Sequence, residues 1–471
     1  MGSNWKTTKL LDHYDIRSGL SKPAKDFGSG YPFLTFKDVF YNYFTPDELG
    51  DLVQSNDKER ENCSVKRGDV FLTRTSETMH ELGMSCVALQ DYENATFNGF
   101  CKRLRPHQNS ELVPEYVGYY LRSSKFRQAM LAFSTMSTRA SLNNEMIARL
   151  EISYPPKDEQ IKIATILKNL DDKIALNRHI NQTLEQMANE LFTSWFVDFD
   201  PVMDNALDAG FFDQDFELPD ELLRRVEARK AVRGNSHFSP LPDAIRHLFP
   251  TAFEECSEAS LGLGGWVPNG WSCSSIYEVM DIIFGAPFKS GLFNDSGEGK
   301  PIIRIRDLKT GSPQIYSVEQ HPKKTLITAG DIIVGMDAEF RATIWSGDDG
   351  YLNQRLFLAK PKGNDVSNLF MKYSLTPLLE VEERAQVGTT VAHLGKKDID
   401  KFSMIVPNQD ALAAYKKLSN SFLSKMVLGM QEINLLTKLR DTLLPKLISG
   451  ELHLKASSPN LPEKKWPDLV R

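Results

Sequence analysis

The sequence predicts an α+β protein in which two mixed α/β domains are joined by two long antiparallel coiled-coil helices, with an internal pseudo-two-fold repeat. Three observations predict this fold. Residues of the first half of the chain recur in the second half at nearly regular separations. Each copy of the repeat ends in a long segment whose apolar residues recur every three or four positions. Short β-branched and aromatic runs, separated by Gly, Asn, Asp and Pro, precede each of these segments.

The repeat is most regular in the part of each copy that is expected to be helical. Upstream of that part the separation drifts, from 266 between Trp5 and Trp271 to 255 between Asn98 and Asn353. Such drift indicates insertions and deletions in loops, whereas one extra residue in a helix would rotate its apolar face by about 100°. The pairs at a constant separation of 252 are Leu142 and Leu394, Ile147 and Ile399, Pro155 and Pro407, Asp158 and Asp410, Lys173 and Lys425, Leu184 and Leu436, and Leu191 and Leu443.

Length and composition describe an ordinary globular chain. Its 471 residues suggest about three domains, and 41% hydrophobic with 25% charged residues is a usual balance. Neither a secretory signal nor an apolar run long enough to span a bilayer is visible. The five cysteines form no C-x-x-C pair, so a reduced, cytoplasmic chain without structural zinc is expected.

The net charge of −6 is unevenly distributed along the chain. Residues 198–258 contain 14 acids and 6 Lys or Arg, so this segment carries −8 and the rest of the chain carries +2. The two predicted domains are therefore close to neutral. This removes an objection to nucleic-acid binding but gives no positive evidence for it, because a basic domain is the usual footprint.

Residues 1–153 are expected to form the first domain, with strands at Phe33–Phe36 and Val70–Thr73 among others. A long helix over 154–197 follows, and Pro155 with the acids after it marks its first turn. About 38 residues of this segment follow the heptad pattern, which corresponds to a rod of roughly 57 Å. The predicted heptad seam consists of Ile163, Leu167, Leu170, Ile174, Asn177, Asn181, Leu184, Ala188, Leu191 and Trp195.

The second copy follows an acidic connector. This connector spans 198–264 and contains one expected short helix, Pro219–Val232. The second domain is expected over 265–404, the second long helix over 405–455, and a frayed Pro- and Lys-rich tail over 456–471. The seam of the second helix is expected at Tyr415, Phe422, Met426, Ile433, Leu436, Leu443 and Leu447.

Two apolar seams of equal length in one chain most simply pack against each other. Antiparallel packing is favoured, because each helix follows its own domain, and it would place the two domains at opposite ends. Parallel packing stays open, since the connector is long enough to return along the helix. Long heptad helices are most often structural or dimerising, and Asn177 and Asn181 are explained equally well by a role in setting the register.

No catalytic motif is recognisable in the sequence. A G-x-x-x-x-G-K-[ST] phosphate loop and an H-E-x-x-H zinc motif are absent, and the nine histidines lack ligand spacing. The Asn-Pro-Pro-aromatic motif of amino-methyltransferases is also absent. The chain is therefore predicted to be non-catalytic and to hold no metal.

The candidate binding residues are cations and hydroxyls in the two domains. Arg304 and Arg306 are expected on one strand face, and Thr35 with Lys37 on the equivalent face of the first domain. Arginines on a rigid strand suit phosphate or guanine contacts, although a solvated face explains any single one equally well. The remaining candidates are Arg74, Arg103, Ser137, Thr138, Lys289, Arg341, Arg355, Thr389 and Thr390. For the four hydroxyl residues among them, a plain turn is the alternative explanation.

Four motifs in a fixed order carry a resemblance to a known family. The chain resembles the specificity subunit of type I restriction–modification systems over nearly its whole length. No single motif is specific alone, but their order together with the internal repeat is. The motifs are Pro155-Pro-Lys-Asp-Glu-Gln160, Trp195-Phe-Val-Asp-Phe-Asp-Pro201, Gly265-Trp-Val-Pro-Asn-Gly-Trp271 and Leu444-Pro-Lys-Leu-Ile-Ser-Gly450-Glu-Leu.

The resemblance implies a non-catalytic, sequence-specific DNA-binding subunit in a prokaryotic cytoplasm. Each domain would be a target recognition domain reading one half of a split site in double-stranded DNA, while the helices set the gap. Two methyltransferase subunits carrying S-adenosylmethionine would dock on the helices and methylate adenine N6. Restriction subunits, which are motor nucleases using ATP, would join them. No cofactor is expected in this chain itself.

Two alternatives stay open at this point. One is the specificity chain of a related phage-defence methylation system that lacks a motor nuclease. The other is a coiled-coil interaction scaffold without a DNA role. The sequence gives neither the recognised bases nor the gap length, because no physical rule converts these loops into bases.

Overall fold

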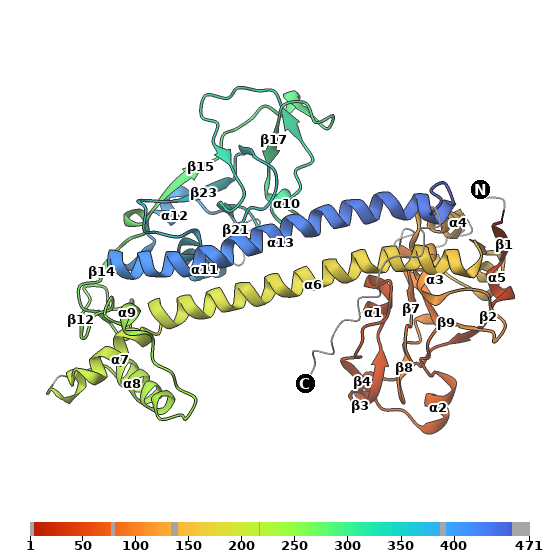
Figure 1. Cartoon of the computed structure of the whole chain (residues 1–471), viewed down its shortest axis with the longest axis horizontal. Helices are drawn as coiled ribbons and strands as arrows, with labels where there is room; N and C mark the ends of the chain where they lie inside the picture. Colours follow the sequence, from red (N-terminus) through yellow and green to blue (C-terminus); the bar gives the residue numbers. More distant parts are fainter. Residues whose placement is uncertain (1–3, 77–80, 133–139, 216, 387–391, 455–471) are drawn as a thin grey trace, which may run out of the picture. The chain divides into compact units, whose positions relative to one another are not determined.

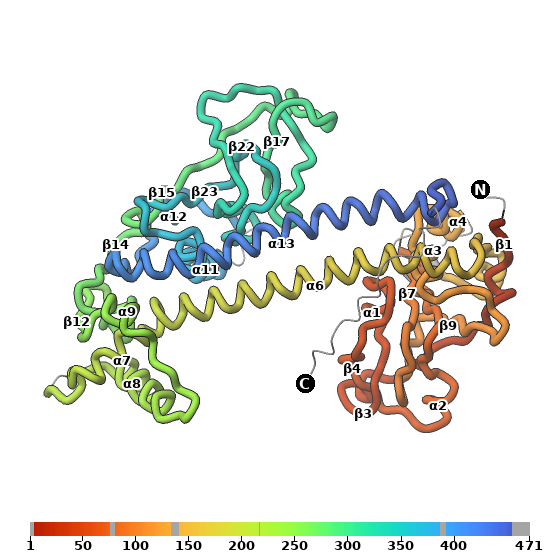
Figure 2. The backbone as a smooth tube through the Cα atoms, viewed as in Figure 1, coloured from red at the N-terminus to blue at the C-terminus, as the bar shows by residue number. Residues whose placement is uncertain are grey.

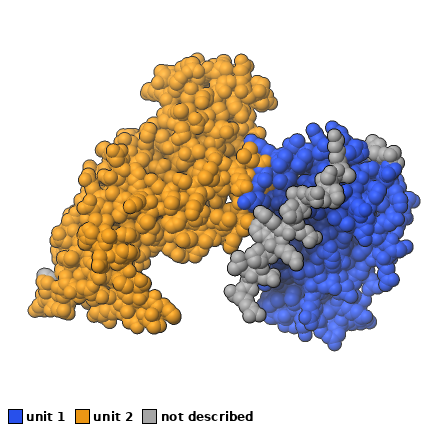
Figure 3. Space-filling model, viewed as in Figure 1, with its two compact units in different colours: residues 1–173, 436–471 blue, residues 174–435 orange. Residues whose placement is uncertain are grey.

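The chain, seen here in a computed structural model, divides into two compact units, which Figure 3 distinguishes by colour. Unit 1 comprises residues 1–173 together with 436–471, and unit 2 comprises residues 174–435. Each unit holds one α/β domain and a part of each long helix, and each is described by itself. The described residues are 4–76, 81–132, 140–215, 217–386 and 392–454.

The first domain is built on an antiparallel four-stranded sheet. Its strands in spatial order are β2 (Tyr14–Ser18), β9 (Cys101–Pro106), β5 (Val70–Thr73) and β7 (Ser85–Val87). A smaller sheet has the order β4 (Asp51–Val53), β3 (Phe27–Leu34) and β8 (Thr96–Phe97), in which β3 and β8 are parallel. The two-stranded pairs are β1 (Lys6–Lys9) with β11 (Glu151–Tyr154) and β6 (Thr75–Ser76) with β10 (Ala140–Ser141).

Five short helices complete the first domain. One core forms where Leu72 and Leu104 of the sheet pack with Tyr116 and Val117 of α3, and all four side chains are buried. Residues of the two long helices, including Leu167 and the buried C-terminal leucines, belong to the same core. The helices are α1 (Phe36–Tyr41), α2 (Asp57–Asn62), α3 (Pro114–Arg122), α4 (Ser124–Ala132) and α5 (Asn144–Arg149).

The second domain repeats this plan. Its antiparallel four-stranded sheet has the order β15 (Met280–Phe284), β23 (Leu356–Pro361), β20 (Ile332–Gly335) and β21 (Ala342–Ile344). A five-stranded sheet has the order β16 (Phe293–Asn294), β18 (Tyr316–Ser317), β17 (Lys300–Ile303), β22 (Gly350–Leu352) and β19 (Leu326–Ile327), and Figure 2 shows β17 and β22 side by side. The pair β14 (Ser272–Ser275) with β24 (Ser403–Val406) and the helices α10 (Ile305–Leu308), α11 (Asn368–Ala385) and α12 (Lys396–Ile399) complete it.

The strand registers confirm that the sequence repeat is a structural repeat. Residues paired across two strands in the first domain have their counterparts paired across the equivalent strands in the second. The insertions and deletions that change the separation between matching residues therefore lie in the loops, and the pairing of the strands is unchanged. The equivalent pairs are Tyr14–Pro106 and Met280–Pro361, Val70–Leu104 and Ile332–Ala359, and, in parallel strands, Phe33–Thr96 and Ile302–Tyr351.

The two long helices are nearly equal in length. α6 (Lys157–Phe196) has 40 residues and α13 (Gln409–Ser449) has 41. Asn177 Nδ2 donates to a Glu432 carboxylate oxygen at 2.8 Å, and Asn181 Nδ2 donates to the Met426 carbonyl at 3.2 Å. Rising numbers on α6 thus meet falling numbers on α13, so the two helices pair antiparallel, as predicted (Figure 1).

The seam residues lie between these helices or against the domains. On α6, Ile163, Leu167, Ile174, Asn177, Ala188 and Trp195 are buried, while Leu170, Asn181, Leu184 and Leu191 are half-buried. On α13, Tyr415, Met426 and Leu447 are buried, while Phe422, Ile433, Leu436 and Leu443 are half-buried. The apolar period therefore marks the face that each helix turns toward its neighbours.

The acidic connector is a folded part of unit 2 rather than a loose linker. Its helices are α7 (Asp200–Asp208), α8 (Asp220–Arg233) and α9 (Asp243–Arg246), and α8 is the expected short helix. Carboxylates four residues apart on α7 face guanidinium groups four residues apart on α8. Nitrogen–oxygen distances of 2.5 Å join Arg225 to Asp200, Arg229 to Asp204 and Arg233 to Asp208.

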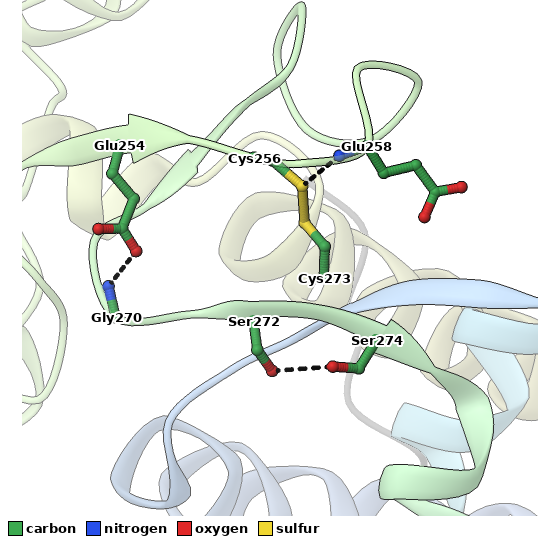
Figure 4. The surroundings of a disulfide bond; sticks show 7 residues. All are labelled: Glu254, Cys256, Glu258, Gly270, Ser272, Cys273 and Ser274. Atoms are coloured by element: carbon green, nitrogen blue, oxygen red, sulfur yellow. Dashed lines mark hydrogen bonds between the residues drawn. A yellow bond between two sulfur atoms is a disulfide. The ribbon is translucent and has the colours of Figure 1, made fainter.

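The expectation of five reduced cysteines is wrong. Cys256 follows β12 (Phe253–Glu255), which pairs with β13 (Trp266–Pro268), and it forms a disulfide with Cys273 of β14 (Figure 4). The two cysteines are 17 positions apart, so spacing alone did not reveal the pair. The hairpin of β12 and β13 and the turn after it, in which the Trp271 amide donates to the Pro268 carbonyl at 3.0 Å, together bring them close. Cys63, Cys86 and Cys101 are free and buried.

Candidate nucleic-acid interface

The strand-face arrangement predicted for Thr35, Lys37, Arg304 and Arg306 is wrong. Both strands end one residue earlier, and Thr35 and Arg304 are the N-cap residues of α1 and α10. The alternation of apolar and polar residues resembled a strand, but an aspartate three positions after each cap closes a capping box instead. Such a box satisfies the free amides of a helix start, which a continuing strand would not leave free.

Both turns share one bond of the capping box, whereas the second bond, from the Asp38 amide to the Thr35 hydroxyl at 3.2 Å, has no counterpart at Arg304, because a guanidinium cannot accept a hydrogen bond. The Thr35 backbone N donates to the Asp38 carboxylate at 2.9 Å, and the Arg304 backbone N donates to the Asp307 carboxylate at 3.0 Å. The Arg304 side chain also turns back onto Asp307, with Nε donating at 3.2 Å. Arg304 is therefore held by its own cap and is only half-exposed.

Two residues after each cap residue, the short helix presents an exposed cation. Lys37 of α1 and Arg306 of α10 are both exposed, and they occupy equivalent positions of the repeat. Their contact with DNA stays a prediction. What the geometry adds is that each stands on a capped helical turn that directly follows the buried end of a strand.

The other two candidates of the first domain differ sharply in exposure. Arg74 lies exposed between β5 and β6. Arg103, on β9, is 2% exposed and donates from Nη1 to the Ser64 carbonyl at 2.6 Å. Burial lowers the pKa of Arg103, and its hydrogen bond serves the interior of the domain. Arg103 is thus placed to stabilise the fold rather than to reach a ligand.

The remaining cationic candidates of the second domain lie on its surface. Lys289 is exposed, and Arg341 is exposed with its Nε 3.3 Å from Glu339. Arg355 is exposed and donates to Asp337 at 2.6 Å. The hydroxyl candidates Ser137, Thr138, Thr389 and Thr390 lie outside the described residues.

A second apolar stripe on the long helices was missed by the sequence analysis. Besides the seam, α6 exposes Leu176, Ile180 and Met187. Two of these recur 252 positions later as Leu428 and Leu439, which are also exposed on α13. Spacings of four and seven residues outside the seam were the available signal. The seam residues pack against other parts of the chain, whereas the residues of this stripe are exposed to solvent on both helices.

Neither a metal group nor a membrane span is found within the described ranges. No three His, Cys, Asp or Glu side chains there are arranged to hold a metal ion. No helix there is long and apolar enough to cross a membrane.

Comparison with known proteins identifies one family over most of the chain. The family model of the type I restriction modification DNA specificity domain matches residues 2–186 and 268–433, one match for each copy of the repeat. The type I restriction enzyme HindI specificity subunit of Haemophilus influenzae is 28% identical over 474 residues, covering 96% of this chain and 100% of that protein. The MjaIX specificity subunit of Methanocaldococcus jannaschii is 24% identical, covering 96% and 94%.

A solved structure shares the fold. The type I restriction-modification system S subunit from M. genitalium superposes with a TM-score of 0.56 at 14% identity. The similarity covers 95% of this chain and 97% of that one. A chain with two α/β domains and two long helices is therefore a fold that a solved protein also has.

Proposed function

Because this chain belongs to the type I restriction-modification DNA specificity family, we propose that it reads a two-part sequence in double-stranded DNA, one half with each domain. One observation carries this proposal. The two domains pair their equivalent strands in the same register, but they carry different side chains at equivalent surface positions. Lys37 and Arg306 illustrate it, since they stand at equivalent positions with different donor geometry. A lysine offers a point charge, whereas an arginine offers a planar fork that fits guanine or phosphate. Two such domains would read two different half-sites.

The long helices are proposed to set the gap between the half-sites. Their constant separation in sequence and nearly equal lengths support this role. A continuous helix fixes distance, because each residue adds about 1.5 Å. A loop of the same length would fix no distance.

Partner subunits are proposed to supply the chemistry. Two methyltransferase subunits would dock on the exposed stripe, one on Leu176 and Met187 and one on Leu428 and Leu439, because equivalent surfaces fit two copies of one partner. Those subunits would bring S-adenosylmethionine, and restriction subunits would bring ATP. The chain itself would be a non-catalytic component that works in the cytoplasm, where the DNA is.

The proposal is tested by expressing the chain with its own methyltransferase subunits and mapping methylated adenines by single-molecule sequencing. A two-part motif with a fixed gap is expected, and it should vanish when this chain is omitted. Replacing Leu176 and Met187 by Asp should abolish co-purification of one of the two methyltransferase copies. A motif that persists without the chain would contradict the proposal.

A further inference from the structure

A three-residue turn occurs at the same place in both domains. It is Asn98-Gly99-Phe100 between β8 and β9, and Asn353-Gln354-Arg355 between β22 and β23. The Asn98 backbone bridges Leu20, and the Asn353 backbone bridges Ala286.

Backbone hydrogen bonds hold the last residue of each turn in the same way. The Arg74 amide donates to the Phe100 carbonyl at 2.7 Å, and the Met336 amide donates to the Arg355 carbonyl at 2.9 Å. Phe100 and Arg355 therefore occupy one structural position with opposite chemistry. Both are strongly exposed, at 62% for Phe100 and 62% for the Arg355 side chain.

In the first domain, two cations flank the exposed aromatic ring. Arg74 is hydrogen-bonded to Phe100 through the backbone, and Lys102 follows two residues after the ring. Thr73 pairs with Cys101 across β5 and β9, so Arg74 and Lys102 follow neighbouring positions of the two strands. Burial and the charge of Arg74 both lower the pKa of Lys102. Among the described residues, no carboxylate forms an ion pair with either. Two adjacent cations without an acid favour an anion such as a phosphate.

In the second domain, a carboxylate orients the exposed arginine. Asp337 accepts a hydrogen bond from Arg355 Nη1 at 2.6 Å and lies 2.7 Å from His393 Nδ1. Burial alone would raise the pKa of Asp337, but the bonds from Arg355 and His393 outweigh it and hold this pKa below its usual value. Arg355 also has a φ of 68°, a region in which non-glycine residues carry strain.

The first domain has no equivalent of this carboxylate. Asp337 bridges His393, and in the first domain the corresponding bridge joins Thr75 to Ser141. Thr75 thus stands at the position of Asp337, and of these two equivalent positions only the one near Arg355 carries a carboxylate. The turn and its surroundings differ together between the domains, while the backbone stays the same.

We propose that this turn is a base-reading position of both domains: Phe100 makes an apolar contact with a base while Arg74 and Lys102 hold the adjacent phosphate, and Arg355, positioned by Asp337, donates to the acceptor edge of a guanine. The inference rests on the proposed DNA function. Phenylalanine suits a thymine methyl or an opened base step, and a guanidinium suits the two acceptors of guanine. Asp337 is a positioning residue, since it acts through Arg355.

The test uses the full chain assembled with its methyltransferase subunits, with methylated motifs mapped for each variant. Phe100→Ala should relax discrimination at one base pair of one half-site by roughly tenfold. Arg355→Ala should do the same at one base pair of the other half-site. Asp337→Asn should relax that same base pair, and adding it to Arg355→Ala should change nothing further. Matched controls are the exposed Tyr41→Ala and Arg384→Ala, which should keep every letter of the motif.

A gain of function completes the test. Phe100→Arg combined with Thr75→Asp should create a preference for guanine at the relaxed position of the first half-site. Unchanged letters in the variants, beside a normal wild-type motif, would overturn the inference alone. So would a uniform loss of methylation with unchanged letters, which indicates a phosphate contact. A wild-type assembly that methylates no two-part sequence would overturn the proposed function and this inference with it.

Discussion

One glycine at the same place in each domain allows two backbone segments to approach closely. A Cβ added at Gly19 would lie 2.2 Å from the Asn98 carbonyl oxygen, and one added at Gly285 would lie 1.9 Å from the Asn353 carbonyl oxygen. No real Cβ approaches a backbone oxygen so closely. Gly19 and Gly285 are 266 positions apart, as Trp5 and Trp271 are. The repeat therefore shows that both copies have a glycine here, but not why a glycine is needed.

Replacing either glycine by alanine is expected to destabilise its domain by roughly 1–3 kcal/mol or more, because the backbone must shift to admit the methyl group. Urea unfolding of the purified chain measures this loss. The same experiment on Gly50→Ala and Gly291→Ala provides the control, since no atom lies within 4 Å of a Cβ at either. Equal stability of all four variants would show that the turns tolerate displacement.

At the same scale, the sequence could not determine which candidate residues are exposed. Arg74 and Arg341 are exposed as a binding residue should be, but Arg103 lies inside the domain. An arginine on a strand points to either face, and only the packing of β9 on its neighbours decides which.

Phe100 was overlooked because an aromatic residue in a β-rich segment is ordinarily part of the core. The match of Asn98 with Asn353 would have aligned Phe100 with Arg355 as equivalent positions of the repeat.

Among the elements, the long helices were the most predictable. A heptad pattern needs only the sequence, because the helix repeats its own geometry at every turn. The connector was the least predictable element. Its composition indicated acidity and one helix, but the pairing of α7 with α8 depends on two helices meeting face to face. The acids of α7 are matched by arginines of α8, so the segment is a folded ionic pair rather than a charged linker.

Two neighbouring residues of α6 separate the roles of its faces. Ile174 is 2% exposed and Leu176 is 51% exposed. Ile174→Ala is expected to cost about 2–5 kcal/mol of stability, because it leaves a cavity in the seam. Leu176→Ala is expected to stay within about 0.5 kcal/mol in the isolated chain. Guanidinium unfolding measures both; comparable losses would mean that the two faces are not distinct.

For the whole molecule, the proposed spacing role rests on the nearly equal lengths of the two helices. Opposing residues such as Asn177 and Glu432 show which segments of α6 and α13 face each other. Removing the same number of residues from facing segments therefore keeps the seam in register. Shortening only one helix would break it.

Residues 176–182 and 428–434 are deleted together, and Thr183→Leu is added so that the exposed leucine of position 176 is restored, while Leu435 moves into the place of Leu428. This variant is expected to shorten the gap of the methylated motif while keeping the letters of both half-sites. Seven residues correspond to about 10 Å of helix and so to about three base pairs. Methylome mapping of the co-expressed system measures the gap. Deleting 176–182 alone is the control and should abolish methylation. Altered letters with an unchanged gap would refute the role of the helices in spacing.

The sequence by itself determined the repeat, the two helices and their equal lengths, because helical periodicity and constant separations are properties of one chain read in order. Through motif order it also indicated the family. The tertiary structure decided the antiparallel pairing, the Cys256–Cys273 disulfide, the burial of Arg103 and the capped turns at Thr35 and Arg304. Each of these depends on residues distant in sequence, or on which of two local hydrogen-bond patterns the surrounding packing favours. Only the folded chain brings such groups together.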